Sequence, residues 1–133
     1  MGMAEAVAVL QAHVAVARVA QEACHRVAAL CLEEGNRQPA ADAGALEAVV
    51  AAMWAHPHVA AMQARQHAAA VQEYGCRALN NVCAGSDAAG LARRQRAVAA
   101  GGREAATATM QAHPGHAQLQ RAGQLVIDRL YSE

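Results

Sequence analysis

The feature that most constrains this sequence is an internal repetition. The segment 46–56 (LEAVVAAMWAH) is similar to 3–13 (MAEAVAVLQAH), forty-three positions upstream, and to 103–113 (REAATATMQAH), fifty-seven positions downstream. A second segment, 71–82, recurs fifty-two positions upstream and forty-eight downstream. A chain that repeats itself in this way is expected to fold as a stack of similar units, because each unit buries its apolar face against the next.

The unequal offsets are explained by two insertions. The distance from the shared histidine to the second segment is six residues in the outer copies and fifteen in the middle copy, so nine extra residues lie near 57–66. Five more lie between Cys83 and Arg94, compared with the span from Cys31 to Arg37. Removing both insertions makes every offset forty-three. A period in the forties is typical of helical repeats with two or three helices per unit.

Apolar residues at helical spacing support an all-α fold. Met3, Ala6, Val7 and Leu10 follow the i, i+3, i+4, i+7 pattern of one helix face, and the middle copy of this segment repeats the pattern. The second segment places Val27, Leu79 and Ile127 at equivalent positions of a second helix, which we expect to form a continuous apolar spine. One slot of the same helix holds three small residues, Ala23, Gly75 and Gly123. A repeated small residue inside a helix predicts the close approach of a neighbouring helix.

The stretches 36–44 and 93–102 are each predicted to form a short helix that precedes the two helices described above. Gly44 and Gly101 are expected to close these helices in the left-handed conformation. Each unit is therefore predicted as a short helix, a helix and a longer helix. The nine extra residues near 57–66 either extend the longer helix toward its N-terminus or form a surface excursion. Arg93, Arg94 and Arg96 are the main basic cluster, which we interpret as a solvated face.

The runs NRQPAADAGALEAVVAAM and VQEYGCRALNNVC resemble the armadillo repeat family, whose third helix has the form Val-Gln-Glu-x-Ala-Cys-Trp-Ala-Leu-x-Asn-Ile-Ala. The resemblance implies a right-handed α-solenoid, an armadillo-like superhelix of three-helix repeats. It covers residues 1–133 as a single domain with a partial repeat at 1–35, a repeat at 36–85 with an insertion near 57–66, and a repeat at 86–133.

The resemblance also implies a function, that of a non-catalytic scaffold binding a partner protein or extended peptide in the groove of the third helices. In such grooves an asparagine binds the peptide backbone, and a tryptophan one turn earlier forms a wall. Asn81 falls on the asparagine position, whereas arginine replaces the tryptophan, so a ladder of asparagines is missing. The equivalents are His25 and Ala29 in the first unit and Leu125 and Arg129 in the third. The candidate partner-binding residues are Arg77, Asn81, His25 and Arg129.

Composition argues against several other classes. Eleven basic and eleven acidic residues give a net charge of zero, so no long-range field attracts nucleic acid or an anionic membrane. Phe is absent and only one Trp and two Tyr occur, too few for stacking single-stranded bases. Neither a signal peptide, a membrane span nor a catalytic motif is recognisable, so we expect a cytoplasmic protein that is not an enzyme and needs no cofactor. A nuclear location stays open.

The cysteines and histidines suggest an alternative, a small metal-binding or redox-responsive helical protein. Cys24 and Cys31 are seven residues apart, as are Cys76 and Cys83, and seven histidines are scattered along the chain. Two cysteines seven residues apart on one helix stand about 10 Å apart along its axis, so they can share neither a metal ion nor a disulfide. Each is therefore predicted to be a small buried residue, with no metal site.

Two further expectations concern the ends of the array. Repeats need neighbours, and the last helix ends on the apolar residues Leu125, Val126, Ile127 and Leu130. The chain is then either a fragment of a longer solenoid without independent activity or a protein that completes its core by forming a homodimer through exposed repeat ends.

Overall fold

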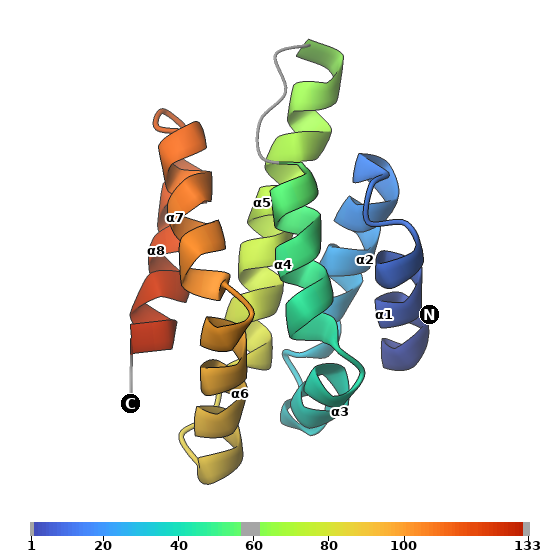
Figure 1. Ribbon diagram of the computed structural model, residues 1–133, viewed down its shortest axis with the longest axis vertical. Coiled ribbons are helices and arrows are strands. Elements are labelled where there is room, and N and C mark those ends of the chain that lie inside the picture. The colour runs from blue at the N-terminus through green and yellow to red at the C-terminus, as the bar shows by residue number, and fades with distance from the viewer. Residues whose placement is uncertain (1, 57–61, 132–133) are drawn as a thin grey trace.

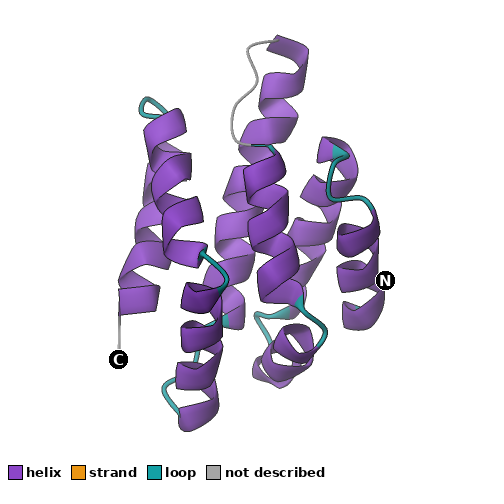
Figure 2. Cartoon of the chain, in the orientation of Figure 1, coloured by secondary structure: helices purple, strands orange, loops and turns teal. Residues whose placement is uncertain are grey.

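All regular secondary structure in the described part of the chain is helical. This computed structural model describes residues 2–56 and 62–131, with side chains described from residue 68 onward in the second range. These ranges form eight α-helices and one 3-10 turn (η1, Glu34–Asn36), with no strand, as Figure 2 shows. The all-α prediction is therefore confirmed. The α-helices are α1 (Met3–Ala12), α2 (Ala17–Leu30), α3 (Arg37–Asp42), α4 (Ala45–Ala55), α5 (Met62–Val82), α6 (Ala88–Ala99), α7 (Gly102–Ala112) and α8 (Ala117–Tyr131).

The helices pack in two layers. Helices α2, α5 and α8 lie side by side in chain order, with α5 in contact with both of the others. Helices α1, α4 and α7 each pack on the member of this layer that follows them in the sequence, while α3 and α6 lie at the lower end (Figure 1). We call the surface formed by α2, α5 and α8 the inner face. Segments about fifty residues apart in the sequence thus become direct neighbours in space.

Two glycines form the equivalent corners between α3 and α4 and between α6 and α7. Gly44 has a φ angle of 91° and Gly101 a φ angle of 93°. This left-handed conformation costs a residue with a Cβ atom about 1–2 kcal/mol. The predicted left-handed glycines are therefore confirmed at both positions.

The predicted close approach at the small-residue slot is also confirmed. A Cβ atom on Gly75 of α5 would lie 2.7 Å from Cγ of Met53 in α4. A Cβ atom on Gly123 of α8 would lie 2.6 Å from Cγ of Met110 in α7. Each methionine thus lies against the bare backbone of the next helix in its own unit.

The end of α2 and the end of α5 are capped by equivalent side chains. Asn36 donates its Nδ2 to the carbonyl of Leu30 at 2.8 Å. Fifty-seven residues later, Arg93 donates its Nε to the carbonyl of Val82 at 2.7 Å. The last carbonyls of a helix lack partners within it, so these side chains satisfy them from the following unit.

The next residue in each unit continues this arrangement. Arg37 donates its Nε to the carbonyl of Cys31 at 3.1 Å, and Arg94 donates its Nη1 to the carbonyl of Cys83 at 3.3 Å. Both Arg93 and Arg94 are buried. The prediction of a solvated basic face is therefore wrong for these two arginines, because the carbonyls at the end of α5 draw their side chains inward. Arg96 alone of the three is exposed.

Helix α5 is the longest helix of the described chain. Counting by the repeat offsets, Ala69 corresponds to the first residues of α2 and α8, yet α5 begins seven residues earlier, at Met62. Of the two alternatives for the insertion, the helical extension is the one observed from residue 62 onward. The remainder of the insertion, 57–61, lies outside the described residues.

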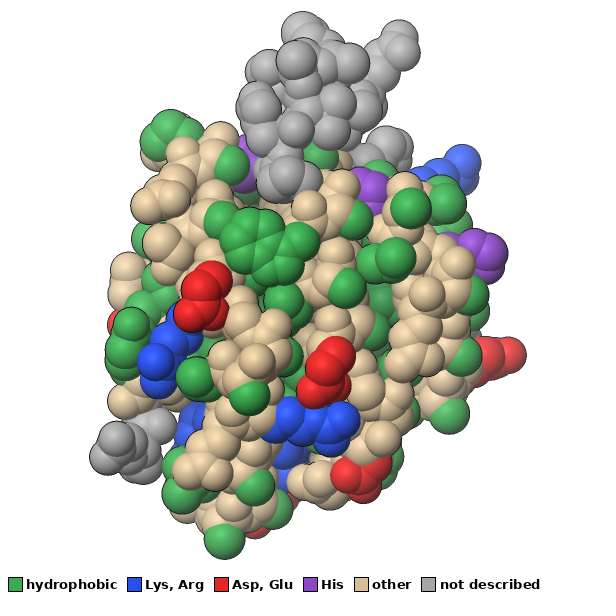
Figure 3. All heavy atoms as spheres, in the orientation of Figure 1, with side chains coloured by type: hydrophobic (Ala, Val, Ile, Leu, Met, Phe, Trp, Pro, Cys, Tyr) green, Lys and Arg blue, Asp and Glu red, His purple; other side chains and the backbone are tan. Residues whose placement is uncertain are grey.

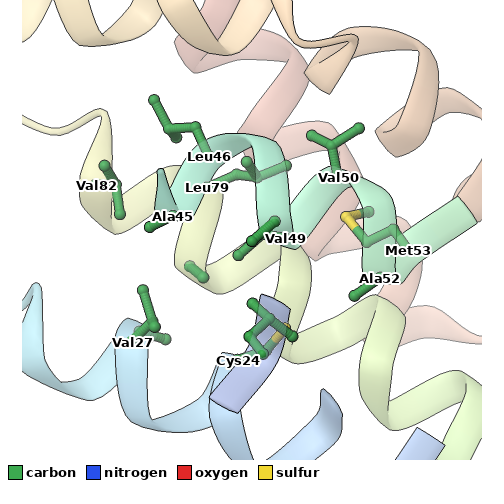
Figure 4. Close-up of a cluster of buried hydrophobic side chains, with 14 of the residues drawn as sticks. Cys24, Val27, Ala45, Leu46, Val49, Val50, Ala52, Met53, Leu79 and Val82 are labelled. Atoms are coloured by element: carbon green, nitrogen blue, oxygen red, sulfur yellow. The ribbon is translucent and has the colours of Figure 1, made fainter. Parts of the chain in front are cut away.

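The core between the layers consists of small and medium-sized side chains. Val27 of α2, Val49 of α4 and Leu79 of α5 are all almost fully buried, and Figure 4 shows them converging with Cys24 and Val82. The equivalent of Leu79 in α8, Ile127, is only partly buried against this cluster. Because many core residues are alanine, stability depends on close helix approach more than on large side chains.

Candidate functional site

The inner face carries a hollow between α5 and α8. The cavity has a volume of about 230 Å³ and is lined by residues of these two helices only. We call it the Arg77 cavity. Its charged and polar lining residues are Glu73, Arg77, Asn80, Asn81, Gln118 and Arg121.

Two of the predicted partner-binding residues, Arg77 and Asn81, line this cavity. The guanidinium of Arg77 pairs with the carboxylate of Glu73, one turn earlier, at 3.1 Å, and more than half of its side chain is exposed. Asn81 donates its Nδ2 to the carbonyl of Ala28 in α2 at 2.8 Å, so it also joins two neighbouring helices. Arg77 therefore offers an accessible charge at the cavity, while the amide of Asn81 is partly occupied within the fold.

The third predicted residue, His25, lies on α2 and is linked to Arg77 through an aromatic ring. The rings of His25 and Tyr74 have centroids 4.6 Å apart at an interplanar angle of 33°. The guanidinium of Arg77 lies over the same tyrosine ring, 5.7 Å from its centroid. An aromatic face stabilises a cation, so Tyr74 helps to position Arg77. The structure thus brings His25 and Arg77 into contact with one side chain, that of Tyr74.

The fourth predicted residue, Arg129, lines a second cavity of about 570 Å³, which we call the Arg129 cavity. Arg129 of α8 donates its Nε to Oδ1 of Asn80 in α5 at 3.1 Å. The cavity is also lined by Ser86, Arg94 and Asp128, among others. Both cavities include Asn80 and Leu125 in their lining, so they lie next to each other, and we call the pair the hollow.

Sequence reasoning missed several residues of this hollow. Asn80, Gln118 and Arg121 line it but were not predicted, because no repeat-equivalent position indicated them. Leu125 occupies the position in the third unit that is equivalent to His25 and Arg77. This equivalence is the sequence signal that could have predicted Leu125 as a lining residue. The side chain of Leu125 is 56% exposed beside both cavities. An exposed leucine at the junction of two hollows gives this surface an apolar contact point.

The four cysteines are buried and form no disulfide. Burial raises the pKa of the Cys24 thiol to about 12, with a smaller contribution from Cys76, and burial raises the pKa of Cys76 to about 12 with a smaller contribution from Glu73. A thiol with so high a pKa carries almost no thiolate at neutral pH, and the thiolate is the form that binds metals and attacks disulfides. The cysteines therefore behave as small core residues.

Two of these thiols also repeat one contact. The Sγ of Cys31 donates to the carbonyl of Asn36, and the Sγ of Cys83 donates to the carbonyl of Arg93, both at 3.8 Å.

Across residues 2–56 and 62–131, no group of three or more His, Cys, Asp or Glu side chains is arranged to hold a metal ion. Within the same part of the chain, no helix is long and apolar enough to cross a membrane.

The face formed by α1, α4 and α7 differs from the inner face. Figure 3 views the molecule from this side, and acidic and basic side chains are scattered over it without gathering into a patch of one sign. One pair near it, Arg96 of α6 and Glu47 of α4, is bonded at 2.9 Å, with each side chain a little under half exposed. Trp54 of α4 is 49% exposed. A cavity of about 570 Å³, lined by Glu47 and Ala48 among others, also lies on this side. The inner face is the candidate site because its cavities are lined by three of the four predicted residues.

In comparisons with known proteins, no protein-family model, curated protein or solved structure matches the chain.

Proposed function

We propose that this protein is a non-catalytic interaction module that binds an extended segment of a partner protein along its inner face. In this proposal the helices form a right-handed superhelix of the armadillo type, in which α2, α5 and α8 are the third helices of successive repeats. The candidate contact residues are His25, Arg77, Asn81 and Arg129, together with Leu125. The proposal includes no nucleic acid, membrane or cofactor, and it assigns the protein to the cytoplasm.

Equivalent contacts in successive units support the repeat architecture. The glycine corners at Gly44 and Gly101 have nearly the same φ angle, and the glycines of α5 and α8 accept a methionine in the same way. The caps at the ends of α2 and α5 come from residues separated by one repeat offset. Identical solutions at a fixed spacing are expected of a stacked array, since each unit meets the same packing problem.

The single observation that carries the proposed function is the pair of adjacent cavities beside α5 and α8, which share Asn80 and Leu125 in their lining. An extended peptide presents backbone amides and alternating side chains, and it gains affinity by placing a few side chains in pockets. The hollow combines an exposed apolar side chain, Leu125, with amides at Asn80 and Asn81 and with charges at Arg77 and Arg121. This mixture suits a mixed polar and apolar segment.

The test is peptide selection followed by a matched pair of variants. A library of random peptides is displayed against the full chain, and selected peptides are measured by fluorescence polarisation. Leu125→Asp places a charge at the centre of the hollow and is expected to weaken binding at least about tenfold. Trp54→Asp makes the same kind of change on the opposite layer and is expected to alter the dissociation constant by less than about twofold.

Two results would overturn the proposed function. One is a selection that yields no peptide with measurable affinity for the folded chain. The other is a set of selected peptides whose affinity is unchanged by Leu125→Asp. Both replaced side chains are exposed, so each variant is expected to fold. Circular dichroism checks this.

Self-association through exposed repeat ends is a separate proposal. Val126 and Leu130, predicted as part of an exposed apolar end, are buried in the monomer, whereas Leu125 and Tyr131 are exposed. The apolar area left for a homodimer is therefore smaller than the sequence alone indicated. Light scattering over a range of protein concentrations tests it, since a mass that stays at 13.8 kDa would contradict dimer formation.

A further inference from the structure

The Arg129 cavity is lined by a buried positive charge, that of Arg94, whose hydrogen bonds go to backbone carbonyls. Arg94 is only 7% exposed, and its Nη1 donates to the carbonyls of Gly85 at 2.6 Å and Cys83 at 3.3 Å. Its Nε is enclosed and has no hydrogen-bond acceptor among the described residues. These carbonyls lie just after the C-terminal end of α5, where the helix dipole supplies a partial negative charge but no full anion. A buried guanidinium is normally paired with an anion because burial removes the solvation of its charge.

Arg93 adds a second buried cation beside the first. It is 6% exposed and donates to the carbonyls of Val82 and Ala84 and to the amide oxygen of Gln38. All of these acceptors are neutral. The end of α5 therefore concentrates two buried arginines whose hydrogen bonds go to groups without charge.

The cavity itself adds a third arginine from α8. The Nε of Arg129 is held by Oδ1 of Asn80 at 3.1 Å, which orients the guanidinium at the cavity wall. The hydroxyl-bearing Ser86 lines the same cavity. Asp128 is the acidic residue of the lining, and its Oδ1 accepts a hydrogen bond from Nε2 of Gln124 at 2.8 Å. Two cations and one anion thus face a space of about 570 Å³.

We infer that the Arg129 cavity binds an anionic oxygen group, a carboxylate or a phosphate, carried by the partner segment. This inference rests on the proposed function and specifies the chemistry of the partner. A planar carboxylate or a phosphate accepts two N–H donors of one guanidinium at once. Arg129 supplies such donors, Ser86 supplies a hydroxyl, and Arg94 in the cavity wall adds a second positive charge. The adjacent Leu125 places an apolar contact next to the anion.

Capping of α5 accounts for the hydrogen bonds of Arg94 but not for the position of Arg129. In the preceding unit Arg37 caps α2 through its Nε, and that residue is only half-buried. Arg129 caps no helix and is held by a side chain of another helix at the cavity wall. Orientation of an arginine by an uncharged amide leaves its charge available to a ligand.

The first experiment uses small anions on the full chain. Isotope-labelled protein is titrated with inorganic phosphate in one arm and with sodium acetate in the other, at constant ionic strength, while side-chain Nε–H and amide signals are followed by NMR. We expect saturable shifts at Arg129, Asn80 and Ser86. Stronger binding of phosphate would identify a phosphorylated residue as the source, and stronger binding of acetate an aspartate or glutamate.

A matched pair of variants separates this site from general surface charge. Arg129→Gln removes the charge at the cavity wall and is expected to weaken anion binding at least about tenfold. Arg18→Gln removes an exposed charge on α2 outside the cavity and is expected to leave the affinity unchanged. Arg94→Gln is unsuitable as the main test because it also removes a helix cap. Absent shifts, or equal losses in Arg129→Gln and Arg18→Gln, would overturn the inference.

Peptides distinguish this inference from the proposed function. Selected peptides are compared as pairs in which one glutamate or phosphoserine is replaced by glutamine or serine. If peptides bind the inner face but the neutral replacements bind equally well, the anion inference is wrong and the proposed function stands. If phosphate or acetate binds while no peptide does, the proposed function is wrong and the anion site stands.

Discussion

The hydroxyl of Thr109 in α7 donates a 2.6 Å hydrogen bond to Oε1 of Gln72 in α5, and both side chains are buried. The Nε2 of the same glutamine donates to the carbonyls of Met53 and His56 at the end of α4. One amide therefore joins α4, α5 and α7. Because its NH2 group faces two carbonyls, its oxygen must accept from the threonine. The hydrogen bonds of Gln72 therefore join the middle unit, which contains α4 and α5, to the following unit, which contains α7.

Replacing Thr109 with valine is expected to destabilise the fold by about 1–3 kcal/mol, since the amide oxygen of Gln72 would stay buried without a donor. Thr109→Ser keeps the hydroxyl and is the control, with a smaller expected loss of about 1 kcal/mol for the missing methyl group. Urea denaturation followed by circular dichroism measures both. A Thr109→Val variant as stable as the natural chain would show that the hydroxyl relies on its other bond, to the carbonyl of Ala105 at 3.0 Å.

Gly75→Ala is expected to have opposite effects in two backgrounds. In the natural chain its Cβ meets Cγ of Met53 at 2.7 Å in a buried site, so overpacking of about 2 kcal/mol outweighs a gain in helix propensity of about 1 kcal/mol. In a Met53→Ala background the clash is gone, and the next neighbour, Cγ1 of Val49, lies at an ordinary 3.5 Å. There the same change should stabilise the chain.

The four proteins of this cycle are compared by chemical denaturation at one temperature. The decisive result is a change of sign in the stability effect of Gly75→Ala between the two backgrounds. This effect is a difference within each background, so the large loss caused by Met53→Ala itself cancels. Equal effects of Gly75→Ala in both backgrounds would contradict the close packing of α4 against α5 at this residue.

Arg93→Ala and Arg96→Ala are expected to differ strongly although the residues are neighbours. Arg93 is buried and satisfies three acceptors, so its loss should destabilise the fold by about 3 kcal/mol. Arg96 makes one exposed ion pair with Glu47, which contributes about 0–1 kcal/mol. Thermal and urea denaturation give both values. Similar small losses would restore the interpretation of these arginines as a solvated cluster.

Stability is expected to fall at alkaline pH because of the buried thiols. Burial raises the pKa of Cys24, Cys76 and Cys83 from 9.0 to about 12. The unfolded chain therefore loses these protons near pH 9 while the folded chain retains them, and the linkage favours unfolding as the pH rises. The contribution is fully present below pH 9 and is lost progressively between pH 9 and about pH 12.

The measurement is the free energy of unfolding from urea denaturation at several pH values above 8, under reducing conditions. A Cys24→Ala variant is the control, because it should show a shallower decline while retaining both tyrosines. Thiol reagents at pH 8 should react slowly with the folded chain and rapidly once urea unfolds it. Rapid reaction of the native protein would argue for the redox or metal-binding alternative.

The repeat arithmetic predicted features that recur because every unit meets the same local problem. Gly44 and Gly101 must take the left-handed conformation to turn the chain, and Gly75 must lack a Cβ atom to admit a methionine. Constraints of this kind restrict the residue at one position, so the sequence records them directly. The extension of α5 was likewise readable, since its residues kept helical spacing.

The fate of polar residues was less predictable from the same pattern. Arg93 and Arg96 differ by three positions and read alike in the sequence, yet one caps α5 and the other reaches solvent. Gln72 and its repeat equivalent Gln120 each donate to two carbonyls at the end of the preceding helix, but the bond that Gln72 accepts from Thr109 in α7 could not be read from the pattern. Which polar group is buried depends on which carbonyl lies opposite, and that is a matter of helix packing.

By itself, the sequence determined an all-helical chain with a fixed stride, because helical periodicity and glycine conformation act over a few residues. Only the tertiary structure decided where a ligand could bind. The hollow beside Leu125 and the charges of Arg94 and Arg129 come from segments more than thirty residues apart, and they meet only when α8 packs beside α5. Their recognition chemistry therefore belongs to the packed helices, since no single segment contains it.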